Sequence, residues 1–332
     1  MKKICVVFLI ALVILTTGCG KKGEKDIVND LEDKINKLKS YKMDGSLEIV
    51  NNDDVYNYDI SSSYKKNDLY KISLTNTAND YEQIILKNDD GVYVLTPSLN
   101  KSFKFQSDWP NSNSQIYLLG SLIDDIKSDD DRKFTESKNS YTFEVDVHYP
   151  NNTKLKKQKI VFDKNLNLKS VKVLNKDNVP LMTFKVKDID YSPTFNKKYF
   201  KVSEALKTVK SNEKTEKTAA IDSTIYPLSL PDNTKLANEE KVDKTEGNRI
   251  IMTFEGDKPF LLVEESVSKE DEMTIVPTLG EPYMLMDTVG AMTDNSITWT
   301  SGGIEYYIVS DVMNQDELLE IARSINVIPT MK

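Results

Sequence analysis

The feature that most constrains the fold is a series of short segments in which apolar and polar residues alternate. In VYNYDISSSY, Tyr56, Tyr58 and Ile60 fall on one face of an extended chain and the intervening polar residues on the other. Similar runs follow at roughly ten-residue spacing: DLYKISL, EQIILK, GVYVLT, KSFKF, YTFEVDV, QKIVFD, LKSVKVL and LMTFKVKDI. Turn signals such as Asp90-Gly91 separate them. The pattern predicts an antiparallel sheet curled into a barrel or half-barrel.

Two helical patterns accompany these strands. Residues 26–39 place Ile27, Leu31, Ile35 and Leu38 at helical spacing, with acids early and lysines late. The run NSNSQIYLLGSLIDDIKS has candidate caps at 111–114, followed by Ile116, Leu119, Leu122, Ile123 and Ile126. So broad an apolar face must be buried, so we expect this second helix to cover the sheet.

A change in composition divides the chain after the strands. Residues 203–224 are polar and of mixed charge, which predicts a linker. Beyond it, hairpins are predicted around Gly256-Asp257 and across 301–303, and Asn314 can cap a closing helix. We therefore expect an α+β protein with a half-barrel domain at 26–202, a linker at 203–224 and a smaller α+β domain at 225–332.

The first residues have the layout of a bacterial lipoprotein signal. Lys2 and Lys3 precede an apolar run of about a dozen residues, which is too short for a permanent membrane span. Small residues then lead to Cys19, although Thr16 stands where leucine is usual. We expect a signal peptide at 1–18, cleavage before a diacylglycerol-modified Cys19, and a tether at 19–25.

Cys19 has three other conceivable roles: disulfide half, buried thiol or nucleophile. Its one candidate disulfide partner, Cys5, lies in the segment predicted to be removed. A catalytic thiol needs a histidine, and His148 is far away in sequence. Lipidation is the remaining prediction. It places the protein on the extracytoplasmic face of the cell membrane, bound to membrane lipid through acylated Cys19.

Charge and motifs exclude several classes of function. The net charge of −8 argues against nucleic acid, which requires a basic footprint. The sequence lacks a Gly-x-Ser-x-Gly elbow, a phosphate loop and a His-Glu-x-x-His motif. His148 is expected to be solvated or paired across strands, and Asp129 to Asp131 to form an acidic loop end. We predict no metal, no cofactor and no enzymatic activity, although a carboxylate pair for glycoside cleavage stays open.

The order of elements behind a lipoprotein signal resembles the LolA-like superfamily over residues 25–200. The segment LKNDDGVYVLTPSLNKSFKF is similar to its strand, Asp-Gly turn, strand and proline unit, and LMTFKVKDIDYSPTFNKKYF is similar to its closing strands. The part from YPLSLP to ELLEIARSI resembles the domain that follows in YdcC-type lipoproteins of spore-forming Gram-positive bacteria. The N-terminal part is also similar to GerS-type germination lipoproteins. The resemblance implies a half-barrel with an apolar concavity beneath helices.

That concavity leaves two interpretations of the inward-facing residues open. Side chains along the predicted strands and second helix either line a ligand cavity or fill a core: Tyr56, Tyr58, Ile60, Tyr70, Ile72, Ile116, Leu119 and Ile123.

Two functions follow from the resemblance. One is a non-catalytic, membrane-anchored lipoprotein that binds another envelope protein in sporulation or germination, and the GerS resemblance implies a cell-wall amidase as such a partner. The alternative is a carrier or sensor that takes up lipid or lipoprotein acyl chains.

Overall fold

The computed structural model describes residues 22–51, 54–111, 114–149, 152, 154–208, 221, 223–245, 247–268, 272–285 and 288–325. The chain forms two units, one up to Lys37 and one from Leu38 onward. The described part of the first unit is mainly α2 (Glu24–Lys37), in which Lys37 pairs with Asp33 at 2.8 Å. The predicted first helix is confirmed, and it begins inside the predicted tether. Cys19 and the signal peptide lie outside the described residues.

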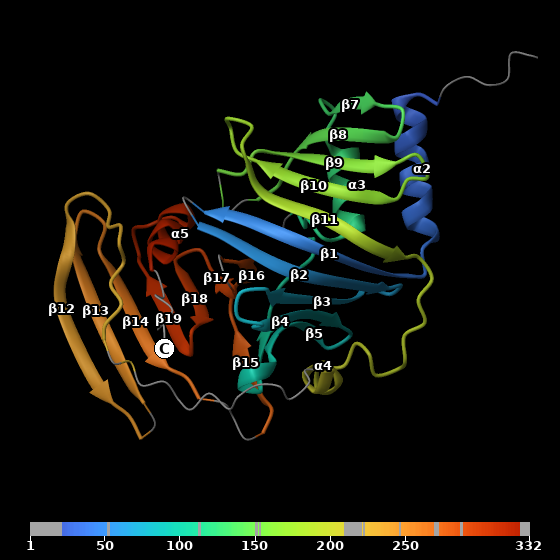
Figure 1. The fold of residues 1–332 in the computed structure, drawn as a ribbon. Coiled ribbons are helices and arrows are strands. Elements are labelled where there is room, and N and C mark those ends of the chain that lie inside the picture. The colour runs from blue at the N-terminus through green and yellow to red at the C-terminus, as the bar shows by residue number, and fades with distance from the viewer. Residues whose placement is uncertain are drawn as a thin grey trace, which may run out of the picture. The chain divides into compact units, whose positions relative to one another are not determined.

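The second unit contains a large sheet of twelve strands (Figure 1). In chain order they are β1 (Ser40–Asn51), β2 (Asp54–Lys65), β3 (Leu69–Asn76), β4 (Glu82–Asn88), β5 (Gly91–Thr96), β6 (Lys101–Phe105), β7 (Lys133–Glu136), β8 (Ser140–Asp146), β9 (Lys157–Asp163), β10 (Leu168–Leu174), β11 (Pro180–Asp190) and β15 (Thr274–Thr278). A short 3₁₀ turn, η1 (Pro97–Leu99), links β5 and β6. The spatial order is β15-β6-β5-β4-β3-β2-β1-β11-β10-β9-β8-β7, so the sheet is open, with β15 and β7 at its edges.

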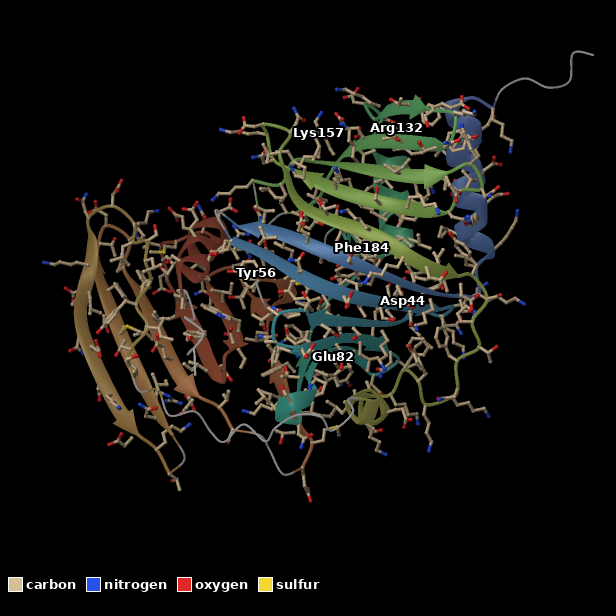
Figure 2. All side chains as sticks on the ribbon, viewed as in Figure 1. Asp44, Tyr56, Glu82, Arg132, Lys157 and Phe184 are labelled. Carbon is tan, nitrogen blue, oxygen red and sulfur yellow. The ribbon has the colours of Figure 1, made fainter. Side chains whose placement is uncertain are left out.

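The centre of this sheet is β1, which the alternation pattern did not identify. It lies between β2 and β11, and its register with β11 shifts between Asp44 and Gly45. A Cβ on Gly45 would lie 2.6 Å from the Phe184 ring, so glycine is required where that ring crosses β1. Figure 2 marks Phe184 on β11 and Tyr56 on β2.

The helix α3 (Leu119–Ser128) covers one face of the sheet with Leu122, Ile123 and Ile126 buried. It begins later than predicted, because Ser114 is not a helix cap. The Ser114 hydroxyl instead accepts from the His148 amide at 2.8 Å and donates to Asp125 at 3.1 Å. Ile116 therefore lies in the turn before the helix.

The other face of β4 and β5 is covered by the segment that follows β11. Phe200 and Ala205, the latter in α4 (Val202–Ala205), pack on Ile84, Leu86, Tyr93 and Leu95. The 3₁₀ turn η2 (Leu206–Thr208) continues α4. Burial on both faces accounts for the nearly continuous apolar character of EQIILK and GVYVLT. It also means that the first residues of the predicted linker are packed against the sheet.

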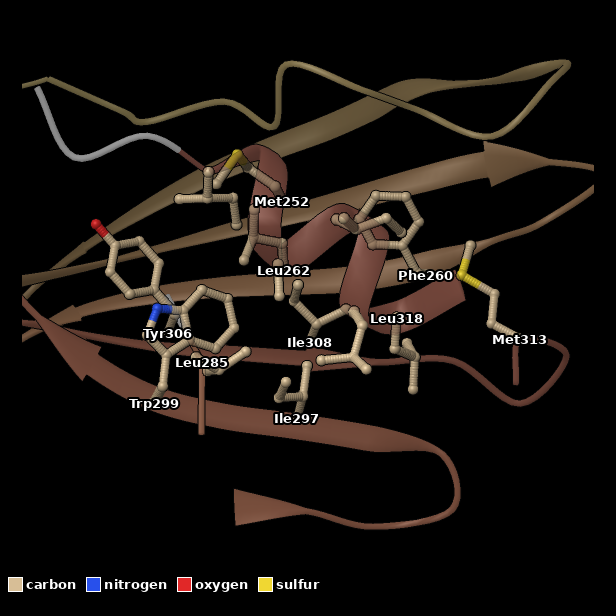
Figure 3. Close-up of a cluster of buried hydrophobic side chains, with 14 of the residues drawn as sticks. Met252, Phe260, Leu262, Leu285, Ile297, Trp299, Tyr306, Ile308, Met313 and Leu318 are labelled. Carbon is tan, nitrogen blue, oxygen red and sulfur yellow. The ribbon is translucent and has the colours of Figure 1, made fainter. Parts of the chain in front are cut away.

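A smaller sheet of seven strands follows. These are β12 (Thr234–Asp243), β13 (Asn248–Gly256), β14 (Phe260–Ser266), β16 (Glu281–Met284), β17 (Val289–Met292), β18 (Ser296–Ser301) and β19 (Ile304–Val309). The helix α5 (Gln315–Ser324) starts with a capping box between Asn314 and Glu317. Its Leu318 belongs to a buried cluster that includes Phe260, Ile308 and Met313 (Figure 3). The predicted α+β class, with an open curved sheet and a smaller sheet with a helix, is confirmed.

The two sheets are joined at the β4 and β6 side of the large sheet. Between β14 and β16 the chain leaves the small sheet and adds β15 to β6 in parallel, pairing Thr274 with Lys101 and Thr278 with Phe105. The buried Gln83 of β4 accepts hydrogen bonds from the Thr288 hydroxyl at 2.9 Å and the Val289 amide at 2.5 Å.

Replacing Gln83 by alanine tests this junction. The change leaves the hydroxyl of Thr288, which is 1% exposed, and the amide of Val289 without their acceptor. We expect a loss of about 2–3 kcal/mol in the free energy of unfolding, because buried polar groups left unsatisfied are costly. Urea denaturation measures it. Gln106→Ala, an exposed position, is the matched control and should change stability by less than about 0.5 kcal/mol. Equal effects of the two variants would contradict the role of Gln83.

Candidate functional site

A pocket of about 470 Å³ lies beside this junction. The large sheet contributes Ile49 and Val50 near the end of β1, the first residues of β11 and Ile85 of β4. Residues 114–117 and, from the loop after β8, residues 149, 152 and 154–156 complete this side of the pocket. The small sheet contributes Pro282 to Met284 of β16, and α5 contributes Arg323. The volume lies in the range of small-molecule sites, about 300–1,000 Å³.

The loop after β8 gives the pocket much of its wall, and local hydrogen bonds shape it. The Asn152 amide donates to Tyr149 at 3.0 Å, and the Leu155 amide donates to Asn152 at 3.2 Å. The Lys156 amide then donates to Leu174 on β10 at 2.9 Å, which returns the chain to the sheet. This compact turn directs Leu155 inward and leaves Lys154 and Lys156 exposed.

The apolar residues on the inner wall of the pocket are buried, whereas the lysines that line it are exposed. The inner wall contains Ile116, Ile85 and Leu155, which are 1%, 2% and 7% exposed. Lys154, Lys156 and Lys176 are exposed and line the mouth, and Arg323 is half-buried. The described lining includes no Asp, Glu, His or Cys. The pocket therefore has an apolar interior and a positively charged opening, although the chain as a whole carries −8.

A polar group at the wall formed by β16 joins the two sheets. The Tyr283 hydroxyl accepts a hydrogen bond from the Asn152 side chain at 3.3 Å, and the positive charge of Arg323 lies close to it. Burial raises the pKa of Tyr283, so its hydroxyl stays protonated. A protonated phenol donates one hydrogen bond and accepts others, so the Tyr283 hydroxyl can donate its proton to an acceptor in the pocket.

Two carboxylates lie near the pocket without lining it. Glu320 of α5 pairs with Lys154 at 2.8 Å, and this contact is exposed on both sides. Asp125 lies behind Ser114 and accepts from Gln158 at 2.5 Å. Burial raises the pKa of Asp125 to about 6, so this carboxyl changes charge in the mildly acidic range.

The structure separates the residues predicted to line a cavity. Ile116 lines the pocket, and half-buried Tyr56 pairs in register with Ile49, another lining residue. The others are buried in the core: Tyr58, Ile60 and Ile72 on the strands, and Leu119 and Ile123 on α3, are each at most 4% exposed. Tyr70 is half-buried and contacts Tyr64 at 5.1 Å and Trp109 at 5.7 Å, measured between ring centroids. Their assignment as ligand contacts stays a prediction.

The remaining sequence candidates occupy structural positions. His148 is exposed just beyond β8 and exchanges backbone contacts with Ser114. Asp129 accepts from the amides of Asp131 and Asp146, at 2.9 and 2.8 Å, and so closes its loop. Within the described ranges, no group of three or more His, Cys, Asp or Glu side chains is arranged to hold a metal ion.

Sequence reasoning missed the pocket residues that carry charge. Arg323 falls within the predicted closing helix, and Lys154, Lys156 and Lys176 are three of the 44 lysines and arginines of the chain. No local pattern distinguishes them, because the segments that bring them together are far apart in the sequence.

Comparison with solved structures gives matches of low similarity. The complex of MucA and MucB from Pseudomonas aeruginosa is 13% identical over 90% of this chain and 98% of that chain, with a TM-score of 0.33. A LolA superfamily protein from Nitrosomonas europaea is 8% identical over 86% and 92%, with a TM-score of 0.23. A chain from the structure of the CwlD amidase of Clostridioides difficile in complex with the GerS lipoprotein is 20% identical over 53% of this chain and 100% of that chain, with a TM-score of 0.24.

Sequence comparison identifies the family. The family described as Sporulation protein YdcC-like matches residues 1–200. Sporulation protein YdcC of Bacillus subtilis (strain 168) is 35% identical over 98% of both chains. The chain therefore belongs to the sporulation protein YdcC-like family, as its sequence resemblance implied.

Proposed function

We propose that this protein is a membrane-anchored, extracytoplasmic lipoprotein that acts without catalysis in sporulation or spore germination by binding another envelope protein. The observation that carries the process is the full-length similarity to a Bacillus subtilis sporulation protein, at 35% identity. A cell-wall amidase is the proposed partner class, on the sequence resemblance to GerS-type lipoproteins.

The small sheet offers a surface for such a partner. β12 is an edge strand whose residues after Thr234 are all exposed, and its outer edge pairs with no described strand. Beside it lie exposed Tyr226, which donates to Glu239 of β12 at 2.6 Å, and Leu228, which is 75% exposed. An open edge next to exposed apolar side chains is a common setting for strand addition or protein docking.

Deleting the gene in its native host and complementing it with variants tests this role. We expect the deletion to alter spore cortex peptidoglycan and slow germination, and the wild-type gene to restore both. Leu228→Glu should accumulate normally but fail to restore them and lose cross-linking to its partner, because it places a charge on the apolar surface. Leu279→Glu, at a site 71% exposed beside β15, is the matched control and should restore both. Unchanged peptidoglycan and normal germination in the deletion strain would refute the proposed process.

The anchor is proposed from the signal sequence and Cys19. No helix in the described part of the chain is long and apolar enough to cross a membrane. Two or three acyl chains on Cys19, each buried methylene contributing about 0.8 kcal/mol, would hold the protein stably at the membrane.

Cys19→Ala tests the anchor. We expect it to abolish metabolic labelling with palmitate and leave a precursor uncleaved after Gly18, with the folded units intact. Gel mobility and palmitate incorporation measure this, and Cys5→Ala is the control that should label normally. Labelling that persists in Cys19→Ala, or a native N-terminus well downstream without acyl mass, would overturn the assignment.

A second candidate function is a carrier or sensor of acyl chains, favoured by the apolar interior of the pocket. Lipid that copurifies with the gently extracted full-length protein, beyond its covalent acyl chains, would support this function. A consistently empty protein would argue against it.

A further inference from the structure

The charge pattern of the pocket indicates what kind of ligand it selects. Four basic side chains reach it from three separate segments: Lys154 and Lys156 from the loop after β8, Lys176 from the turn after β10, and Arg323 from α5. Of these cations, Lys154 pairs with Glu320 at 2.8 Å, and this ion pair is exposed on both sides. In a chain of net charge −8, this is a local concentration of positive charge that attracts anions.

The arrangement of these residues also sets the orientation of a ligand. The lysines at the mouth are exposed, whereas Ile85, Ile116 and Leu155 form the buried interior. A purely polar anion would leave this interior unfilled, and a purely apolar ligand would leave the cations at the mouth unused. An amphiphile satisfies both, with its chain inside and its headgroup at the opening.

Tyr283 and Arg323 supply the specific contacts at the headgroup. Arg323 presents a fork of donors that suits carboxylate and phosphate oxygens, and it lines the pocket together with Tyr283. The Tyr283 hydroxyl accepts from Asn152, so its proton can be donated to an anionic oxygen.

We propose that this pocket binds a single-chain amphiphile with an anionic carboxylate or phosphate headgroup, held by Arg323 and Tyr283 and attracted by the three lysines. The proposal rests on the second candidate function and adds the headgroup chemistry and the residues that recognise it. It assigns the contact to a wall built by β16 and α5, outside the face beneath α3 where a cavity was expected.

Native mass spectrometry of the full-length protein released from maltoside micelles tests the proposal. Palmitate and methyl palmitate serve as matched probes, because they share a chain and differ in headgroup charge. We expect palmitate to bind at least about tenfold more tightly than its ester, a difference of about 1.4 kcal/mol. Lysophosphatidic acid should bind comparably to palmitate, and inorganic phosphate alone should bind far more weakly.

Variants assign that preference to the named residues. Arg323→Gln and Tyr283→Phe should each reduce the palmitate preference severalfold and leave binding of methyl palmitate unchanged. Arg323→Lys should retain part of it. Lys235→Gln, which removes an exposed cation from β12, is the control and should keep the full preference. Ile116→Trp should fill the interior and weaken both probes. Thermal melting of each variant confirms that it is folded.

The possible failures are distinguishable. Equal binding of palmitate and its ester by the wild-type protein would overturn the headgroup assignment and leave the acyl-chain function standing. Binding of neither probe would overturn both. Phosphate binding without palmitate binding would show an anion site without a chain pocket and would also refute the proposal.

Discussion

The structure from Leu38 onward depends on one backbone pairing, the parallel addition of β15 to β6. Five consecutive residue pairs hold this strand at the edge of the large sheet, although the strands before and after it belong to the small sheet. Because β16 follows soon after β15, the pairing brings Pro282 and Tyr283 against the loop after β8. The buried Gln83 secures the next part of the chain through Thr288 and Val289. The pocket wall is a consequence of these contacts.

Local sequence signals predicted the elements that local interactions determine. The alternating runs became strands β2 to β6 and β8 to β11, and Gly256-Asp257 became the turn between β13 and β14. Asn314 caps α5, as predicted. Its side chain accepts from the Glu317 amide, and the Glu317 side chain accepts from the Asn314 amide. In each case the determining contacts lie within a few residues, so a single segment carries the information.

Features that depend on distant contacts could not be predicted in this way. β1 was missed because its apolar pattern is interrupted by Gly45, whose presence is explained by the approach of Phe184 from β11. The start of α3 was placed too early because Ser114 bonds to His148 and Asp125 in place of capping the helix. The charged residues of the pocket come together through the pairing of β15 with β6. The short segment TIVPT carries no pattern that predicts this pairing.

The last turn of α5 connects the pocket with the exposed apolar surface of the small sheet. Arg323 lines the pocket, and the carbonyl of the next residue, Ser324, accepts from the Leu228 amide at 3.1 Å. A ligand that binds Arg323 and also fills the interior at Ile116 contacts both sides of the junction, so it stabilises their joined arrangement by about 2.7 kcal/mol at a free concentration of 100 Kd. The segment around Leu228 is held by the same turn. Suppose that a partner binds Leu228 more tightly in the joined arrangement. The ligand would then raise the affinity for the partner, and the partner would raise the affinity for the ligand by the same factor, because linkage is reciprocal. The two proposed functions are therefore compatible in one molecule, and they would be coupled only if the partner binds the joined arrangement more tightly.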